Sequence, residues 1–224
     1  MATPVVCMIT DRVRLAAPTL DTATDEAGRR TPGAAVERRV LQQDRLVARI
    51  AAAARAGVHL VQIRERDLDG RALFELVRAC VDAVRATRTR VLVNDRVDVA
   101  VAAGAHGVHL RSDSLPAARA RAITPPGFLI GRSVHDAGEA RRVTADGAVD
   151  YVIFGPVFET ASKPGKPAAG LAALSAAVAA TSVPVLAVGG MSRDRIAAIT
   201  ATGAAGIAAI GLFADAADEL SVFV

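Results

Sequence analysis

Short runs of apolar residues recur along the chain, and each is too short to form a helix. They are rich in Val, Ile and Leu, as strands buried on both faces usually are. We predict strands at Val5–Ile9, His59–Ile63, Val91–Val93, Gly107–Leu110, Phe128–Gly131, Tyr151–Phe154, Val185–Val188 and Gly206–Ile210. A polar turn and a longer Ala-rich stretch follow each run.

The Ala-rich stretches carry apolar residues at helical spacing, which predicts a helix after every strand. Asp67 and Asp69 precede the second helix and are candidate caps for it. The expected helices are Leu41–Ala56, Gly70–Thr87, Val97–Ala103, Pro116–Ala122, Asp136–Ala145, Leu171–Ala180, Ser192–Ala201 and Ala214–Leu220.

Alternating helices and continuously apolar strands predict a parallel sheet covered on both faces. Eight units of one strand and one helix close into a barrel. We therefore expect one α/β domain over residues 1–224, a (β/α)8 TIM barrel. The stretch from Arg12 to Gln43 breaks the rhythm, with several Pro, Gly and Thr residues. We interpret residues 12–43 as an insertion in the first βα-loop, either flexible or acting as a lid.

Composition narrows the class of protein. Apolar residues make up 52% of the 224 residues, which is enough for a buried core. The two cysteines, Cys7 and Cys80, fall in a predicted strand and a predicted helix and lack paired metal-ligand spacing, so we expect neither a disulfide nor a zinc site. The chain lacks a signal-like N-terminus and a long apolar span, so we expect a cytoplasmic protein without a membrane partner. With aromatics at 3% and a net charge of +4, small phosphorylated substrates are better suited partners than nucleic acid. The sequence leaves open whether the chain forms a homo-oligomer.

Functional side chains of such a barrel come from the C-terminal ends of the strands and the loops that follow them. These positions hold cations, hydrogen-bond donors and glycines, which suit phosphate or diphosphate. Arg64 and Arg66 occupy alternate positions and should project to one side, where two guanidinium groups could hold a diphosphate; the structural alternative is a salt-bridge network with Glu65. Gly189 and Gly190 after the seventh strand, and Gly211 after the eighth, offer backbone amides to a phosphate.

Two further residues suggest chemistry. Asp95 could bind Mg²⁺ together with substrate phosphates, or it could pair with Arg96. His135, at the end of the fifth strand, could act as a general acid or base near neutral pH. The remaining histidines, His59, His106 and His109, are expected to be structural.

At these motifs the sequence resembles the thiamine phosphate synthase family, which also contains the TenI thiazole tautomerases. The resemblance covers about Val58 to Phe213 and touches Thr10 and Asp11 at the first strand. The motifs that carry it are Val61–Arg66, Asn94–Ala100, Gly107–Leu110, Phe154–Thr160, Ser162–Lys163 and Ala187–Met191.

The resemblance implies a synthase that joins hydroxymethylpyrimidine diphosphate to a thiazole phosphate and releases diphosphate. Arg64 and Lys163 would be its catalytic residues, and Mg²⁺ would be its cofactor, held by Asp95; His135 would be the catalytic residue if the chain were a tautomerase. The substrate-binding residues would be Gln62, Arg66, Asn94, Ser133, Thr160, Ser162, Gly189, Gly190 and Gly211.

The sequence departs from the synthase pattern in three places. Arg66 stands where the family has Lys, and Ser114 stands where it has the second metal carboxylate, so that Asp113 is the remaining candidate for that ligand. The segment Gly131–His135 is closer to the tautomerases, in which a histidine moves a proton on the thiazole ring without a metal. Three interpretations stay open: a synthase, a tautomerase, and a non-catalytic protein that binds thiazole phosphate.

Overall fold

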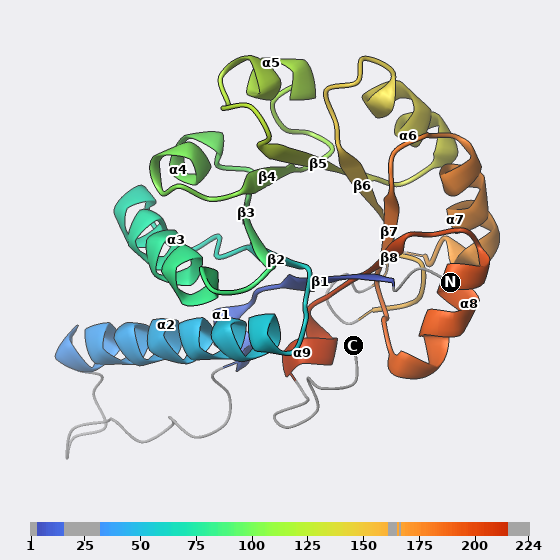
Figure 1. The fold of residues 1–224 in the computed structure, drawn as a ribbon. Coiled ribbons are helices and arrows are strands. Elements are labelled where there is room, and N and C mark those ends of the chain that lie inside the picture. Colours follow the sequence, from blue (N-terminus) through green and yellow to red (C-terminus); the bar gives the residue numbers. More distant parts are fainter. Residues whose placement is uncertain (1–3, 16–31, 161–164, 166, 215–224) are drawn as a thin grey trace.

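The computed structural model describes residues 4–15, 32–160, 165 and 167–214. In this part of the chain, eight parallel strands form a closed barrel in chain order (Figure 1), which confirms the predicted (β/α)8 TIM barrel. The strands are β1 (Val5–Ile9), β2 (Leu60–Ile63), β3 (Arg90–Asn94), β4 (Gly107–Leu110), β5 (Leu129–Val134), β6 (Tyr151–Phe154), β7 (Val185–Val188) and β8 (Gly206–Ala209).

Helices surround the barrel (Figure 1). They are α1 (Arg12–Leu15), α2 (Pro32–Arg55), α3 (Gly70–Val84), α4 (Val97–Ala102), α5 (Ala117–Ala122), α6 (Ala137–Thr144), α7 (Gly170–Ala179), the 3₁₀ helix η1 (Arg193–Arg195), α8 (Ile196–Ala201) and α9 (Gly211–Ala214).

The first βα connection differs most from the prediction. Helix α2 begins at Pro32, well before the expected Leu41, and α1 was not predicted. The later part of the predicted insertion, residues 32–43, is therefore helical, and its residues 16–31 lie outside the described residues. The expected last helix, Ala214–Leu220, also lies outside them apart from Ala214, which ends α9.

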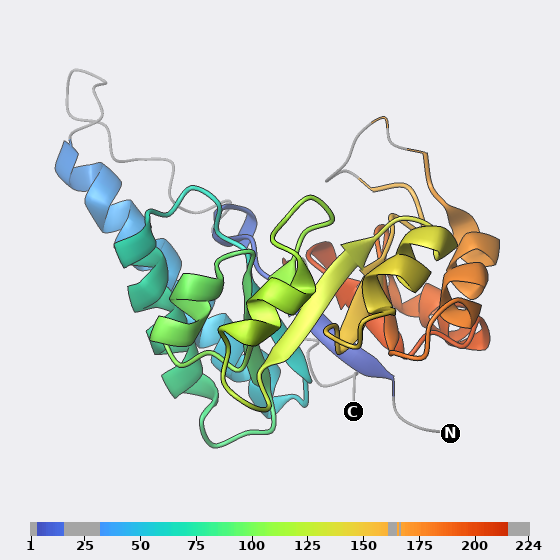
Figure 2. The same cartoon turned by 90° about the horizontal axis from the view of Figure 1, so that it is seen from above.

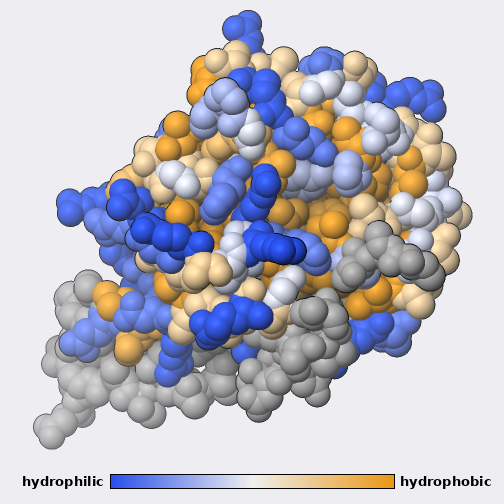
Figure 3. Space-filling view, in the orientation of Figure 1, coloured by the Kyte–Doolittle hydropathy of each residue, from blue (hydrophilic) through white to orange (hydrophobic). Residues whose placement is uncertain are grey.

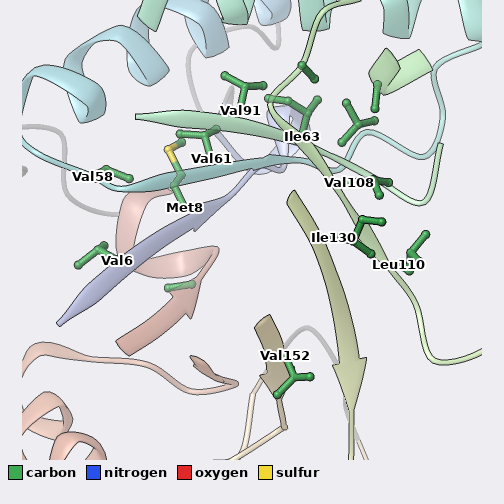
Figure 4. Close-up of a cluster of buried hydrophobic side chains, with 14 of the residues drawn as sticks. Val6, Met8, Val58, Val61, Ile63, Val91, Val108, Leu110, Ile130 and Val152 are labelled. Carbon is green, nitrogen blue, oxygen red and sulfur yellow. The ribbon is translucent and has the colours of Figure 1, made fainter. Parts of the chain in front are cut away.

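Alternation along the strands separates two buried clusters. Val6 and Met8 of β1 belong to the larger cluster between strands and helices, part of which is shown in Figure 4. Cys7 and Ile9 belong to the smaller cluster inside the barrel, together with Leu92, Tyr151, Ile153, Leu186 and Ala208. Cys7 and Cys80 are buried free thiols, in keeping with the expectation that they form no disulfide.

The strands all point to the same end of the barrel. Figure 2 shows β1 (blue) rising to α1 at the end that carries the loop after β4 (green). On the face seen in Figure 1, hydrophilic side chains lie among small hydrophobic areas (Figure 3), a mixture typical of protein surfaces. None of the helices in the described part of the chain is long and apolar enough to cross a bilayer.

Candidate active site

The C-terminal ends of the strands surround a cavity of about 570 Å³. Polar and apolar side chains from the barrel interior form its floor, and residues of the βα-loops form its rim. The lining residues are Ile9, Asp11, Gln62, Arg64, Arg66, Asn94, His109, Arg111, Ser112, Asp113, Ser133, His135, Ile153, Pro156, Thr160, Val188, Gly189 and Ile210. Most of the candidate residues from the sequence therefore meet in one place.

Three guanidinium groups, from Arg64, Arg66 and Arg111, line this cavity. Burial, and next the neighbouring charge of Arg66, lower the pKa of Arg64, but a guanidinium remains charged at neutral pH. Arg111 donates two hydrogen bonds of 2.9 and 2.8 Å to the carboxylate of Asp113. Such a group of cations is suited to a ligand with several phosphate oxygens.

Glu65 does not face the cavity with the arginines but ties β2 to the end of β1. It accepts hydrogen bonds from Thr10 Oγ1 at 2.6 Å and from Arg12 Nη1 at 3.0 Å, and Arg12 also pairs with Asp67. The side chains of Arg12 and Glu65 are only 4% and 3% exposed. Thr10 Oγ1 in turn accepts from the backbone N–H of Arg64 at 2.9 Å, so this buried network fixes the backbone that carries Arg64.

The floor of the cavity contains an acceptor without a partner. Gln62 Nε2 donates to Asn94 Oδ1 at 3.0 Å, which orients both amides. The Gln62 side chain is buried, and its Oε1 has no hydrogen-bond partner among the described residues. Since buried polar atoms are almost always paired, this oxygen is suited to accept a hydrogen bond from a bound ligand.

His109 was expected to be structural, but the structure places it on the cavity floor. Its Nε2 lies 2.9 Å from Ser133 Oγ and its Nδ1 lies 3.1 Å from the Tyr151 hydroxyl. By contrast, His59 and His106 accept hydrogen bonds from the backbone N–H groups of Val6 and Val91, as structural residues do. Its position one residue before a strand end was the signal that could have identified His109.

Asp95 lies beside the cavity and not in its lining, in a smaller hollow with Glu65, Arg66 and Arg111. Its backbone has φ of 67°, and its Oδ1 is buried without a hydrogen-bond partner in the described chain. Arg96 pairs with Asp98 and not with Asp95, which removes that alternative. Asp95 Oδ2 is 3.7 Å from Arg111 Nε.

Asp113, the candidate for a second metal-binding carboxylate, is less well placed than Asp95 to bind an ion. The Asp113 side chain is 70% exposed and is held by Arg111. Within the described residues there is no group of three or more His, Cys, Asp or Glu side chains arranged to hold a metal. Asp95 therefore fits a cation that takes one protein carboxylate and completes its shell with phosphate oxygens and water.

The glycines after β7 bring the backbone close to the loop after β6. Gly189 and Gly190 have φ of 99° and 62°. A Cβ at Gly189 would lie 2.7 Å from Pro156, and one at Gly190 would lie 2.5 Å from the carbonyl oxygen of Glu159. Both positions thus require glycine.

The other candidates occupy several places. Gly189 and Thr160 line the cavity, whereas Gly190 and Gly211 are not among its lining residues. Gly211 lies next to the guanidinium of Arg14, which would be 3.1 Å from a Cβ there. Ser162 and Lys163 lie outside the described residues.

His135 stands on the rim, and its side chain is 41% exposed. Its backbone N–H donates to Glu139 Oε2 at 2.8 Å, and its Nδ1 lies 3.2 Å from the same oxygen. The carboxylate of Glu139 therefore orients the ring so that Nε2 is left for other contacts. This geometry is compatible with proton transfer at the rim.

Comparison with known proteins gives one consistent result. The family described as thiamine monophosphate synthase matches residues 34–213. Thiamine-phosphate synthase from Methanoculleus marisnigri is 46% identical over 165 residues, which cover 73% of this chain and 77% of the relative. Thiamine-phosphate synthase from Anaeromyxobacter dehalogenans is 42% identical, with coverage of 77% of each chain.

A solved structure agrees with these relatives. Thiamine phosphate pyrophosphorylase from Pyrococcus furiosus superimposes with a TM-score of 0.75 at 27% identity and covers 99% of this chain and 92% of its own. 3-Hexulose-6-phosphate synthase, at 20% identity and a TM-score of 0.61, shares the fold. The chain therefore belongs to the thiamine monophosphate synthase family, and it is an enzyme of that family.

Proposed function

We propose that the chain joins hydroxymethylpyrimidine diphosphate to a thiazole phosphate. In this reaction the bond between the pyrimidine methylene carbon and the diphosphate oxygen breaks, and its electron pair leaves with the diphosphate. The thiazole nitrogen then donates its lone pair to the methylene carbon, which gives thiamine phosphate. The names of the relatives support this transfer, and the cavity offers separate groups for the heterocycle and for the anion.

The floor of the cavity is suited to the aminopyrimidine ring. The unpartnered Gln62 Oε1 would accept a hydrogen bond from the amino group, and the hydrogen bond to Asn94 holds it in place. Ile9 and Ile153 line the same cavity and would supply apolar contacts to the ring. This buried, oriented acceptor is the observation that most strongly supports a heterocycle as ligand.

The rim is suited to the diphosphate. Arg64 and Arg66 would contact its oxygens and stabilise the negative charge that grows as the bond breaks, which makes Arg64 a catalytic residue. Thr160, Ser162, Lys163, Gly189, Gly190 and Gly211 would bind the thiazole phosphate or the leaving group. Arg66 can hold two oxygens at once, which a lysine at this position could not do.

Asp95 would hold Mg²⁺, since its unpartnered Oδ1 fits a hard cation that also binds phosphate oxygens. When bound, the ion would neutralise charge on the departing diphosphate. Asp113 could bind the ion only if its two hydrogen bonds from Arg111 broke. We therefore propose that the main role of Asp113 is to position Arg111.

A tautomerase acting through His135 is the second candidate, because Glu139 orients that ring at the rim. One assay separates the two. The purified chain is supplied with pyrimidine diphosphate and thiazole phosphate, with and without Mg²⁺, and thiamine phosphate is measured. We expect product that requires Mg²⁺; isomerisation of a thiazole carboxylate phosphate that disappears in His135→Ala, without thiamine phosphate, would overturn the proposal.

A further inference from the structure

Three polar side chains form a hydrogen-bonded series inside the barrel. The Tyr151 hydroxyl lies 3.1 Å from His109 Nδ1, and His109 Nε2 lies 2.9 Å from Ser133 Oγ. Tyr151 and His109 are buried, whereas Ser133 is half-buried, and both His109 and Ser133 line the cavity. The series therefore leads from the barrel interior to a surface that a ligand can touch.

A glycine in the intervening strand makes this contact possible. His109 of β4 is paired with Gly131 of β5, and Gly131 is paired with Tyr151 of β6. A Cβ at Gly131 would lie 2.1 Å from Tyr151 Cζ and 2.3 Å from its hydroxyl oxygen. Ser133 stands two residues farther along β5, on the same face. The bare backbone of β5 thus lets Tyr151 and His109 meet across it.

The proton positions follow from the partners. Burial lowers the pKa of His109 to about 3, so its ring is neutral and has one N–H and one bare nitrogen. Burial also raises the pKa of Tyr151, which therefore keeps its hydrogen. His109 is the only hydrogen-bond partner of that hydroxyl among the described residues.

Only one arrangement leaves no buried hydrogen without an acceptor. If His109 Nδ1 carried the hydrogen, Tyr151 would have to accept it, and the hydroxyl hydrogen of Tyr151 would have nowhere to go. Tyr151 must therefore donate to Nδ1. The ring hydrogen is then on Nε2, from which it is donated to Ser133 Oγ.

We propose that Tyr151 is a positioning residue that holds His109 in its Nε2–H tautomer and thereby makes Ser133 a hydrogen-bond donor toward the cavity. Because Ser133 Oγ accepts from His109, its own hydrogen is left for the ligand. The ligand atom at this point is then an acceptor, such as the bare nitrogen of a heteroaromatic ring, and not an amino group. That the ring is a pyrimidine rests on the proposed function; the tautomer does not.

Nuclear magnetic resonance on the full chain labelled with ¹⁵N-histidine tests the tautomer directly. The long-range ¹H–¹⁵N pattern of a neutral imidazole distinguishes Nε2–H from Nδ1–H, and single His→Gln variants at His59, His106 and His135 identify the His109 signals. We expect Nε2–H in the wild type and a mixture of both tautomers in Tyr151→Phe. An Nδ1–H ring in the wild type would overturn the proposal, even if Tyr151→Phe did not fold.

Ser133→Ala is the matched control. Because Tyr151, and not Ser133, is proposed to set the tautomer, His109 should remain Nε2–H when the serine hydroxyl is removed. A change to Nδ1–H in this variant would assign the tautomer to Ser133 and would overturn the role of Tyr151. A merely structural role of Tyr151 would change the melting temperature without changing the tautomer.

Kinetics test the consequence for the ligand. In Tyr151→Phe the KM for pyrimidine diphosphate should rise about tenfold, as for one lost hydrogen bond, while the KM for thiazole phosphate should stay nearly constant. An equal rise in both values would contradict a specific effect on Ser133. An inactive wild-type chain with an Nε2–H ring would remove the synthase assignment and leave the role of Tyr151 in place.

Discussion

Asp95 combines a left-handed backbone conformation with a carboxylate oxygen that lacks a partner. Its φ of 67° is unusual for a residue with a side chain, although Asp and Asn adopt this region more readily than most residues. Backbone strain of this kind gathers at functional sites. The conformation directs the carboxylate toward Arg111 and the hollow beside the cavity.

Asp95→Asn should therefore lower kcat in the presence of Mg²⁺ by about a hundredfold, which corresponds to about 3 kcal/mol of lost charge stabilisation. The melting temperature should change little, because Asn tolerates the same φ. Initial rates of thiamine phosphate formation measure the effect. Asp113→Asn is the control and should cost about fivefold or less, since that carboxylate is exposed. Equal losses in both variants would place both carboxylates at the metal.

A change at Gln62 should affect substrate binding more than stability. Gln62→Leu removes a buried oxygen without a partner, which is a gain, and also the hydrogen bond to Asn94 Oδ1, which is a loss, so the free energy of unfolding should change by no more than about 1 kcal/mol. The same change removes the acceptor for the substrate, so the KM for pyrimidine diphosphate should rise about tenfold. Urea denaturation and steady-state kinetics measure the two effects. An unchanged KM in this variant would show that this oxygen does not contact the substrate.

At the level of elements, the buried network joins three segments at the first two strand ends. Arg12 at the start of α1 is bound by Glu65 after β2 and by Asp67 in the loop before α3. Thr10 after β1 connects this network to the backbone of Arg64. The position of Arg64 on the cavity rim therefore depends on ion pairs that do not touch the ligand.

Glu65→Gln should lower the free energy of unfolding by about 3 kcal/mol, because it leaves the buried Arg12 guanidinium with one charged partner in place of two. The rate of thiamine phosphate formation should fall as well. The Thr10 hydroxyl that donates to Glu65 also accepts from the backbone N–H of Arg64 and so helps to place that residue. Chemical denaturation at neutral pH is the measurement. Glu75→Gln, which breaks the exposed Arg71 pair on α3, should leave stability unchanged. If the two variants behaved alike, the network would contribute no more than a surface ion pair.

Elements with a simple pattern could be predicted, and those fixed by side-chain partners could not. The strands β1, β4, β6 and β7 have the predicted bounds, because continuous apolar residues encode strands buried on both faces. Strand β5 extends three residues past the predicted Gly131, through Arg132 and Ser133. The apolar pattern did not predict this extension because Arg132 and Ser133 are polar. Arg132 is buried against loop carbonyls, and Ser133 faces the cavity.

The same limit applies to the capping and ionic residues. Asp69 accepts a hydrogen bond from the N–H of Ala72 and caps α3, as expected. Asp67, the other candidate cap, instead binds Arg12. Arg12 lies 55 positions away along the chain, and local patterns carry no information about such a partner. Glu65 was likewise weighed as a salt-bridge residue, but its partner is an arginine that the sequence analysis placed in a loop.

For the molecule as a whole, barrel closure brings distant motifs to one cavity. Residues from β2, β3, β4 and β5 supply its polar floor, namely Gln62, Asn94, His109 and Ser133. The order of the strands, and the rule that active sites of such barrels form at the C-terminal ends of the strands, were sufficient to predict that these residues lie around one cavity. The tautomer of His109 and the unpartnered state of Gln62 depend on atomic contacts between strands, which only the folded barrel provides.

The neutral His109 inside the barrel should also make the stability of the whole molecule depend on pH. Burial, and next the charge of Arg132, lower its pKa from the ordinary 6.5 to about 3. Between these values the unfolded chain binds a proton that the folded chain does not bind, so the free energy of unfolding contributed by His109 falls as the pH falls below 6.5. Above that value the contribution is fully present.

Urea denaturation at pH 5 and pH 7 measures this contribution. The loss of stability on acidification should be larger for the wild type than for His109→Gln by about 2 kcal/mol, since glutamine takes up no proton in this range. Other titrating groups affect both proteins equally, so the difference between the two isolates the imidazole. Parallel pH dependence in the two proteins would mean that His109 accepts a proton in the folded barrel, and the Nε2–H tautomer could not then persist at pH 5.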